Sequence, residues 1–233
     1  MLQESEPIRH TSLASSAADW ITSRIIEGQI KPGERITEVG LAEQMGISRS
    51  PVREALRSLS REGLITVEPR RGARVGELDR VHAADLYAAR LLLEPECVRG
   101  AVAVITEARV AELGRILRTM TAAVQARDAA AYLSALKIYN WTLLDGCPNR
   151  VLFGFAEASW RSSLRYWDLL VRGSLSYLTQ SLRRNRAVYA AIGRRDADKA
   201  AQVSTLVLER GGTELLKVLD KMGPRAGSTA ENR

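Results

Sequence analysis

The feature that most constrains the fold is a helical pattern of apolar residues that runs almost unbroken from residue 81 to residue 222. It predicts helices near residues 82–104, 107–126, 128–145, 149–172, 174–193 and 196–222. Residues that cap or break helices separate them: Asp79, Asp128, Pro148-Asn149, Gly173-Ser174 and Asp196. We therefore expect residues 79–223 to form an all-helical domain, followed by a flexible tail over residues 224–233.

The N-terminal part, residues 1–78, has a different pattern. Shorter helices are predicted near residues 13–27, 37–45 and 48–61, with Gly28, Gly46 and Gly63 ending them. Two β-rich runs follow, at residues 64–67 and 73–75, and residues 68–72 between them are typical of a hairpin. This layout predicts a winged helix-turn-helix with a small β-hairpin wing. The whole chain is thus expected to be mainly α.

The third of these helices carries two distinct faces. An apolar stripe at helical spacing is formed by Val52, Ala55, Leu56 and Leu59. Arg49 and Arg53 lie four residues apart on another face, near the helix start, which is where a recognition helix meets base edges.

These residues have the chemistry of DNA contacts. An arginine that pairs in a bidentate manner with guanine contributes roughly 1–3 kcal/mol of discrimination. Ser48 and Ser50 can donate to phosphates or bases, and Arg70 and Arg71 at the hairpin tip suit the minor groove or the backbone. Gly72 allows the tight turn. The competing interpretation is a solvated arginine face with serine caps.

Charge is distributed unevenly along the chain, whose formal net charge is +7. Residues 1–78 hold 11 basic and 11 acidic side chains, whereas residues 79–233 hold 23 and 16. Within the first part, however, residues 49–74 carry seven arginines and three glutamates. Because salt screens charges beyond about 8–10 Å, this local excess matters more for DNA than the total.

Composition excludes several classes of protein. Two cysteines without a Cys-x-x-Cys pair favour a reduced, cytoplasmic chain, and two histidines exclude most histidine-based metal sites and triads. No run of about 18 apolar residues is present, so neither a membrane span nor a membrane partner is expected. The first ten residues lack the apolar core of a secretory signal.

The first part of the chain resembles the DNA-binding domain of the GntR family of bacterial transcription regulators. The resemblance is carried by Ile26–Ile36, Leu41–Leu56, Glu62–Leu64 and Pro69–Gly72. It implies a homodimer on a palindromic operator, with contacts from Ser48, Arg49, Ser50, Arg53 and the wing at Arg70, Arg71 and Gly72. Some relatives place an arginine early in the preceding helix, where this chain has Val39.

The second part resembles the FCD-type effector domain of the FadR subfamily. The resemblance is carried by Asp85–Glu94, Asn149–Leu152 and Ala190–Asp196. The family commonly binds a divalent metal through an Asp and three His, beside a carboxylate effector. Those positions fall on Leu136, Asn140, Asn185 and Val207 in this chain. Leu and Val are not ligands and Asn is a poor one, so we expect neither a metal nor another cofactor.

Polar residues interrupt the apolar faces of several predicted helices, namely Arg90, Asn140 and Asn185. Tyr166 adds a polar hydroxyl to the apolar face of the helix predicted at residues 149–172. One hypothesis places them in a pocket for a small anionic effector such as a carboxylate, with Arg90 receiving its charge. The alternative is that Arg90 pairs internally, for example with Glu94, and that the two asparagines bond the backbone.

The leading prediction is a DNA-binding transcription regulator, a repressor, controlled by an effector in the helical domain. A second hypothesis is an enzyme whose winged domain is an adaptor, and a third is a winged domain used only for protein contacts. The enzyme hypothesis lacks a convergent set of titratable residues: the predicted bundle contains no nucleophile motif, and neither histidine fits a catalytic set there. The third leaves the Arg49 and Arg53 face unexplained.

Overall fold

The structure, a computed structural model, describes residues 12–26, 28–61, 63–68, 72–172 and 175–222. The chain divides into two compact units, residues 1–77 and residues 78–233, and each is described by itself. The tail predicted over residues 224–233 lies outside the described residues. Within the described part, no helix is both long and apolar enough to cross a membrane.

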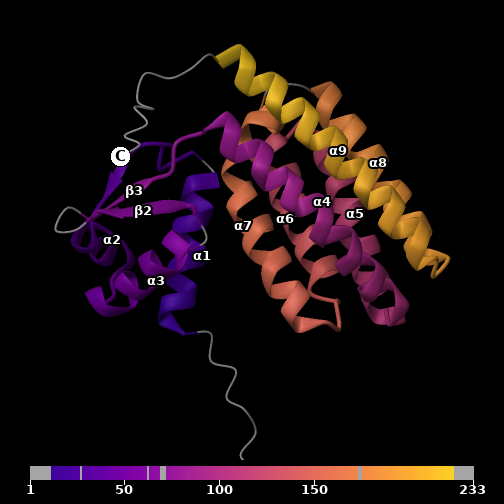
Figure 1. Cartoon of the computed structure of the whole chain (residues 1–233), viewed down its shortest axis with the longest axis horizontal. Helices are drawn as coiled ribbons and strands as arrows, with labels where there is room; N and C mark the ends of the chain where they lie inside the picture. The colour runs from indigo at the N-terminus through magenta and orange to yellow at the C-terminus, as the bar shows by residue number, and fades with distance from the viewer. Residues whose placement is uncertain (1–11, 27, 62, 69–71, 173–174, 223–233) are drawn as a thin grey trace, which may run out of the picture. The chain divides into compact units, whose positions relative to one another are not determined.

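The described residues of the N-terminal unit form three helices and three short strands (Figure 1). In chain order they are α1 (Leu13–Ile26), β1 (Arg35–Ile36), α2 (Glu38–Met45), α3 (Arg49–Arg61), β2 (Ile65–Glu68) and β3 (Gly72–Val75). The Thr37 hydroxyl accepts a hydrogen bond from the amide of Gly40 and so caps α2, while Gly46 ends it in a left-handed conformation. Both helix boundaries agree with the sequence pattern.

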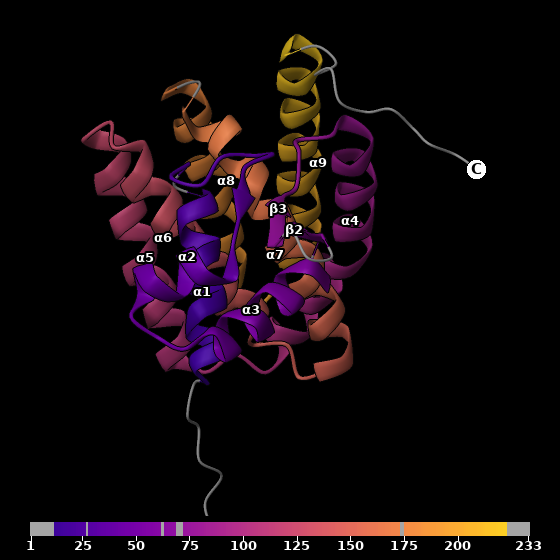
Figure 2. The same ribbon diagram turned by 90° about the vertical axis from the view of Figure 1, so that its left-hand side faces the viewer.

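The strands form one antiparallel sheet in the order β1-β3-β2, which Figure 2 shows beside α3 of the same unit. Strands β2 and β3 are the predicted wing hairpin, with Glu68 opposite Gly72. Strand β1 was not predicted, because two residues are too few to show an alternating pattern.

The core of the N-terminal unit is built on the apolar stripe of α3. Val52, Ala55, Leu56 and Leu59 are all buried, in one cluster with Ile21 of α1 and residues of the sheet. Burial of this stripe fixes the rotation of α3 about its axis, so its opposite face stays in solvent. The core therefore decides which arginines α3 exposes.

The C-terminal unit is entirely helical in its described part. Its helices are α4 (Arg80–Ala103), α5 (Glu107–Gln125), α6 (Ala129–Leu144), α7 (Arg150–Arg172), α8 (Leu175–Gly193) and α9 (Ala197–Met222). Helix α4 packs mainly along α9 and also against α7, and α5 packs against α6 and α8 (Figure 1). The side chains of Asp79, Asp128 and Asp196 cap helix starts as the sequence predicted.

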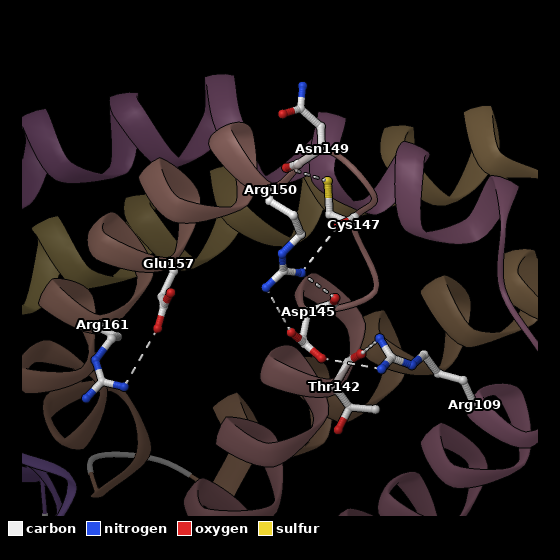
Figure 3. A network of polar contacts seen from close by, with 8 residues as sticks. All are labelled: Arg109, Thr142, Asp145, Cys147, Asn149, Arg150, Glu157 and Arg161. Carbon is white, nitrogen blue, oxygen red and sulfur yellow. Dashed lines mark hydrogen bonds and ion pairs between the residues drawn. The ribbon is translucent and has the colours of Figure 1, made fainter. Parts of the chain in front are cut away.

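Arginines fix the turn between α6 and α7 (Figure 3). The Asp145 carboxylate lies 3.3 Å from Arg109 on one side and 3.3 Å from Arg150 on the other. Arg150 also donates to the backbone carbonyl oxygens of Asp145 and Cys147, and the Cys147 thiol lies 3.6 Å from the carbonyl oxygen of Asn149. Because these contacts join α5 to the turn, they hold one end of α6 in place.

Candidate nucleic-acid interface and effector cavity

The start of α3 presents exposed polar residues. Helix α3 begins at Arg49, so Ser50 lies within its first turn and Ser48 directly precedes it. The side chains of Ser48, Arg49 and Ser50 are all exposed. Among the described residues, none forms an ion pair with Arg49, which leaves its guanidinium available to a ligand.

Arg53, one turn later, is held by a carboxylate from α2. Its Nε lies 2.9 Å from Oε1 of Glu38, and its Nη2 lies 2.7 Å from Oε2. The hydrogen bond from Arg53 lowers the pKa of Glu38, so the carboxylate stays ionised. Glu38 thus occupies the Nε edge of the guanidinium, and the Nη1 edge remains for the two acceptors of a guanine.

The wing is closed by a glycine that no other residue could replace without strain. Gly72 has φ of 90°, and a Cβ built there would lie 2.5 Å from the carbonyl oxygen of Ile36. The tight approach of β3 to β1 therefore requires glycine. Arg70 and Arg71, predicted to form the wing tip, lie outside the described residues.

Carboxylates partly offset the local positive charge of residues 49–74. Glu68 accepts from Arg35 and Arg74 at 3.0 Å each, which ties the three strands together and lowers the pKa of Glu68. Arg53 is paired with Glu38 in the same manner. Among the described arginines of this stretch, Arg49, Arg57 and Arg61 form no ion pair with a described carboxylate, and Arg49 is the one at the start of α3.

A cavity that is partly open to solvent lies within the C-terminal unit. Its walls come from α4, α6, α7, α8 and α9, and the lining residues are Tyr87, Arg90, Glu94, Leu136, Tyr139, Asn140, Leu143, Trp167, Leu170, Tyr177, Ser181, Asn185, Val188, Ser204, Val207, Leu208 and Gly211.

Arg90 lines this cavity as a member of a buried ion pair. Its Nε and Nη2 both donate to the carboxylate of Glu94, and the two side chains are 3% and 4% exposed. Burial opposes the charge on Arg90, but the Glu94 carboxylate and the Tyr87 hydroxyl together outweigh it and raise the pKa of the guanidinium. Arg90 therefore lines the cavity and is paired with Glu94, the internal partner named in the alternative interpretation.

The three other effector candidates are placed differently. Asn140 and Asn185 line the cavity, and each donates from Nδ2 to the carbonyl oxygen four residues earlier, Leu136 at 2.9 Å and Ser181 at 3.0 Å. Tyr166 does not line it. The Tyr166 hydroxyl lies 3.1 Å from the carbonyl oxygen of Asp79 and helps to anchor the start of α4.

The four positions that resemble the family's metal ligands converge on this cavity. Leu136, Asn140, Asn185 and Val207 all belong to its lining. Two of these side chains are aliphatic, and the other two are amides that each commit an N–H to a helix carbonyl. Such a donor set does not fit a divalent metal ion. The part of the chain described here holds no group of three or more His, Cys, Asp or Glu side chains suited to a metal.

Aromatic residues form much of the wall, and the sequence analysis did not assign them to the site. Tyr87, Tyr139, Trp167 and Tyr177 come from four different helices. The Arg90 guanidinium carbon lies 4.8 Å from the centre of the Tyr87 ring. Gly212 makes room for that ring, since a Cβ there would lie 2.8 Å from its Cδ1 atom.

Comparison with known proteins accounts for both units. Residues 13–75 match the family described as bacterial regulatory proteins, gntR family, and residues 85–210 match the FCD domain. The second match alone covers more than half of the chain. The chain belongs to the GntR family, with an FCD domain at its C-terminal side.

The curated GntR-family relatives match part of their length. An uncharacterized HTH-type transcriptional regulator, YdhC, from Bacillus subtilis is 42% identical over 89 residues, which are 38% of each chain. The gluconate operon transcriptional repressor of the same species is 35% identical over 121 residues, 52% of this chain and 49% of the repressor. The chain thus spans less than half the length of these relatives.

A solved GntR-family structure shares the fold. Escherichia coli McbR/YncC superposes with a TM-score of 0.80 at 22% identity, over 89% of this chain and 99% of that one. At this level of identity, the similarity concerns the fold alone.

Proposed function

We propose that this GntR-family chain is a sequence-specific DNA-binding repressor whose affinity for its operator is controlled by a small molecule bound in the FCD domain. The observation that carries the proposal is the exposed start of α3, where Arg49 is unpaired among the described residues and Arg53 is oriented by Glu38. A pair of arginines at this position matches the geometry with which recognition helices read guanine. The proposed site of action is the cytoplasm.

The sign of regulation and the mode of binding are also part of the proposal. A relative with 35% identity is named a repressor, which supports repression here. A homodimer would present two copies of α3 to a palindromic operator. Effector binding would shift the dimer between arrangements of different DNA affinity, which requires that the two arrangements bind the effector unequally.

The cavity supports effector control without a metal. It carries a few polar groups among apolar and aromatic walls, the composition typical of small-molecule sites. The anionic effector expected from the sequence depended on a free Arg90, and the Glu94 carboxylate removes that basis. The proposed function therefore keeps the effector, and the charge of the effector is argued separately below.

The test is DNA selection with the full chain, followed by titration of the selected site at several salt concentrations. We expect a selective site, a steep salt dependence, and a loss of roughly 1–3 kcal/mol of operator binding in Arg49→Ala. The matched control is Arg118→Ala, which removes an exposed arginine from α5. Failure to select any site, or equal losses in both variants, would refute a DNA-reading role for α3.

Native mass spectrometry of the freshly purified protein tests the assembly. We expect a dimer, and any mass retained above that of the two chains would report a bound ligand or ion. A monomer at the concentrations that saturate the operator would contradict the two-site arrangement.

A further inference from the structure

We infer that the cavity of the FCD domain takes an uncharged, ring-containing small molecule with an amide or similar donor–acceptor group, and discriminates against carboxylates. The inference rests on the proposed function, because it specifies the effector that would control DNA binding. Three features of the cavity support it: its net charge, its free hydrogen-bonding groups and its aromatic walls.

The charged groups of the cavity cancel. Arg90 and Glu94 are the charged residues of its lining, and they are bonded to each other. Burial raises the pKa of Tyr87, Tyr139 and Tyr177, so all three phenols stay neutral at physiological pH. The cavity therefore has no net charge with which to attract an anion.

A carboxylate ligand would meet a guanidinium whose charge Glu94 already neutralises. Arg90 is 3% exposed, and its Nε and Nη2 atoms are already bonded to the Glu94 carboxylate. If a carboxylate ligand displaced Glu94 from Arg90, the Glu94 carboxylate would remain buried without a cation. If the ligand bound beside an intact Arg90–Glu94 pair, its own carboxylate would be the charge without a partner. Either arrangement carries the cost of burying a charge without a partner.

The two asparagines offer a neutral pattern instead. Each has committed one N–H to its own helix. Asn140 keeps its amide oxygen and second N–H for a ligand, whereas the side chain of Asn185 also interacts with the Tyr132 hydroxyl and keeps its amide oxygen. One acceptor and one donor on the same group complement a primary amide. A carboxylate could bond the N–H but would face the amide oxygen with no hydrogen to donate.

The walls favour a flat, apolar body. Tyr87, Tyr139, Trp167 and Tyr177 supply rings from four helices, and aliphatic side chains also line the cavity. Aromatic faces and edges pack well against a ligand ring. A small aromatic amide thus satisfies the walls and the asparagines together, while the Arg90–Glu94 pair stays intact.

The experiment compares benzamide with benzoate, which share a ring and differ in the charge of one group. Binding to the full chain is measured by calorimetry and by the shift of its melting temperature. For the natural sequence, we expect benzamide to bind at least about tenfold more tightly than benzoate, because only the latter brings an unpaired charge into the cavity.

Variants that change the charge of α4 test whether the Arg90–Glu94 pair causes the preference for benzamide. Glu94→Gln leaves Arg90 without its carboxylate, and we expect the preference to reverse in favour of benzoate. The double variant Arg90→Gln/Glu94→Gln restores a neutral cavity and should again prefer benzamide. Glu96→Gln is the matched control, since Glu96 is on the same helix but 53% exposed beside Arg99, and it should behave as the natural sequence does.

Several results would overturn the inference. They are tighter binding of benzoate by the natural sequence, an unchanged preference in a folded Glu94→Gln, and no binding of either probe at millimolar concentration. The first would direct attention to Arg184, which lies 5.8 Å from the centre of the Tyr177 ring but does not line the cavity. Operator binding measured on the same samples separates these results from failure of the proposed function.

Discussion

Two Arg–Glu pairs, one in each unit, use the same chemistry in opposite surroundings. Arg53 and Glu38 join α3 to α2 in solvent, with side chains 52% and 29% exposed. Arg90 and Glu94 lie one turn apart on α4 and are almost fully buried. In both pairs, two guanidinium nitrogens bond one carboxylate.

The difference in exposure gives the pairs different roles. In water, an ion pair adds little to stability, so under the proposed function the main effect of the Glu38 carboxylate is to orient Arg53 toward a DNA base. Inside the bundle, neither charge is tolerable alone, and the pair serves to cancel charge at the wall of a cavity. Loss of the carboxylate should therefore affect DNA selectivity in one unit and stability in the other.

The largest expected effect follows from Glu94→Leu. The substitution leaves Arg90 charged, buried and unpaired, and we expect the free energy of unfolding to fall by about 3–5 kcal/mol. Chemical denaturation of the full chain, followed by the signal of the C-terminal tryptophans, measures this loss.

A double variant distinguishes charge from packing. Arg90→Met/Glu94→Leu removes both charges at similar volume, and we expect it to recover most of the lost stability. Equal losses in the single and double variants would instead mean that the shape of these side chains, and not their charge, is what the bundle requires.

An intermediate effect is expected from Glu38→Gln in the other unit. Without the carboxylate, Arg53 is free to adopt other rotamers, and we expect the ratio of operator binding to nonspecific binding to fall by about tenfold. Nonspecific affinity should not fall, since a negative charge near the phosphates is removed. Fluorescence anisotropy with operator and scrambled duplexes gives both values.

Glu43→Gln is the control for this result, because Glu43 is an exposed carboxylate on the same helix. A parallel rise of operator and scrambled affinity in both variants would show that Glu38 contributes only general repulsion. The exposed Arg53–Glu38 pair would then have no role in DNA selectivity.

The smallest effect is expected for Glu68→Gln in the wing. Hydrogen bonds from Arg35 and Arg74 lower the pKa of Glu68, so the pair contributes stability above the pKa of a free carboxyl and loses it as pH falls through the lowered value. The unfolding midpoint should drop slightly at neutral pH, and the difference from the natural sequence should vanish in acid and in high salt. Glu54→Gln, an exposed carboxylate on α3, provides the baseline.

Most of the fold followed from local patterns. The caps at Thr37, Asp79 and Asp128 mark helix starts, and the stripe at Val52 and Leu56 identifies the buried face of α3. These signals act within one or two turns, so the sequence displays them directly. Strand β1 was missed because its pairing with β3 joins residues far apart in the chain.

The candidate sites were predictable in part. Arg49 and Arg53 stand out by their spacing on one helix, whereas Glu38 is 15 residues from Arg53 and gave no local signal. Arg90 and the asparagines were found as polar breaks in apolar stripes. The tyrosines of the cavity were not, because an aromatic residue on a helix has the same pattern in a core as in a binding site.

By itself, the sequence predicted a winged helix-turn-helix followed by an all-helical domain. The resemblance to FCD-type domains implied that Leu136, Asn140, Asn185 and Val207 stand where that family has its metal ligands. Only the tertiary structure decided that these four positions line one cavity, and that Glu94 neutralises Arg90 at its wall. The reason is physical. Helical periodicity and capping are local, whereas the charge of a cavity is a sum over side chains that only the packing of five helices brings together.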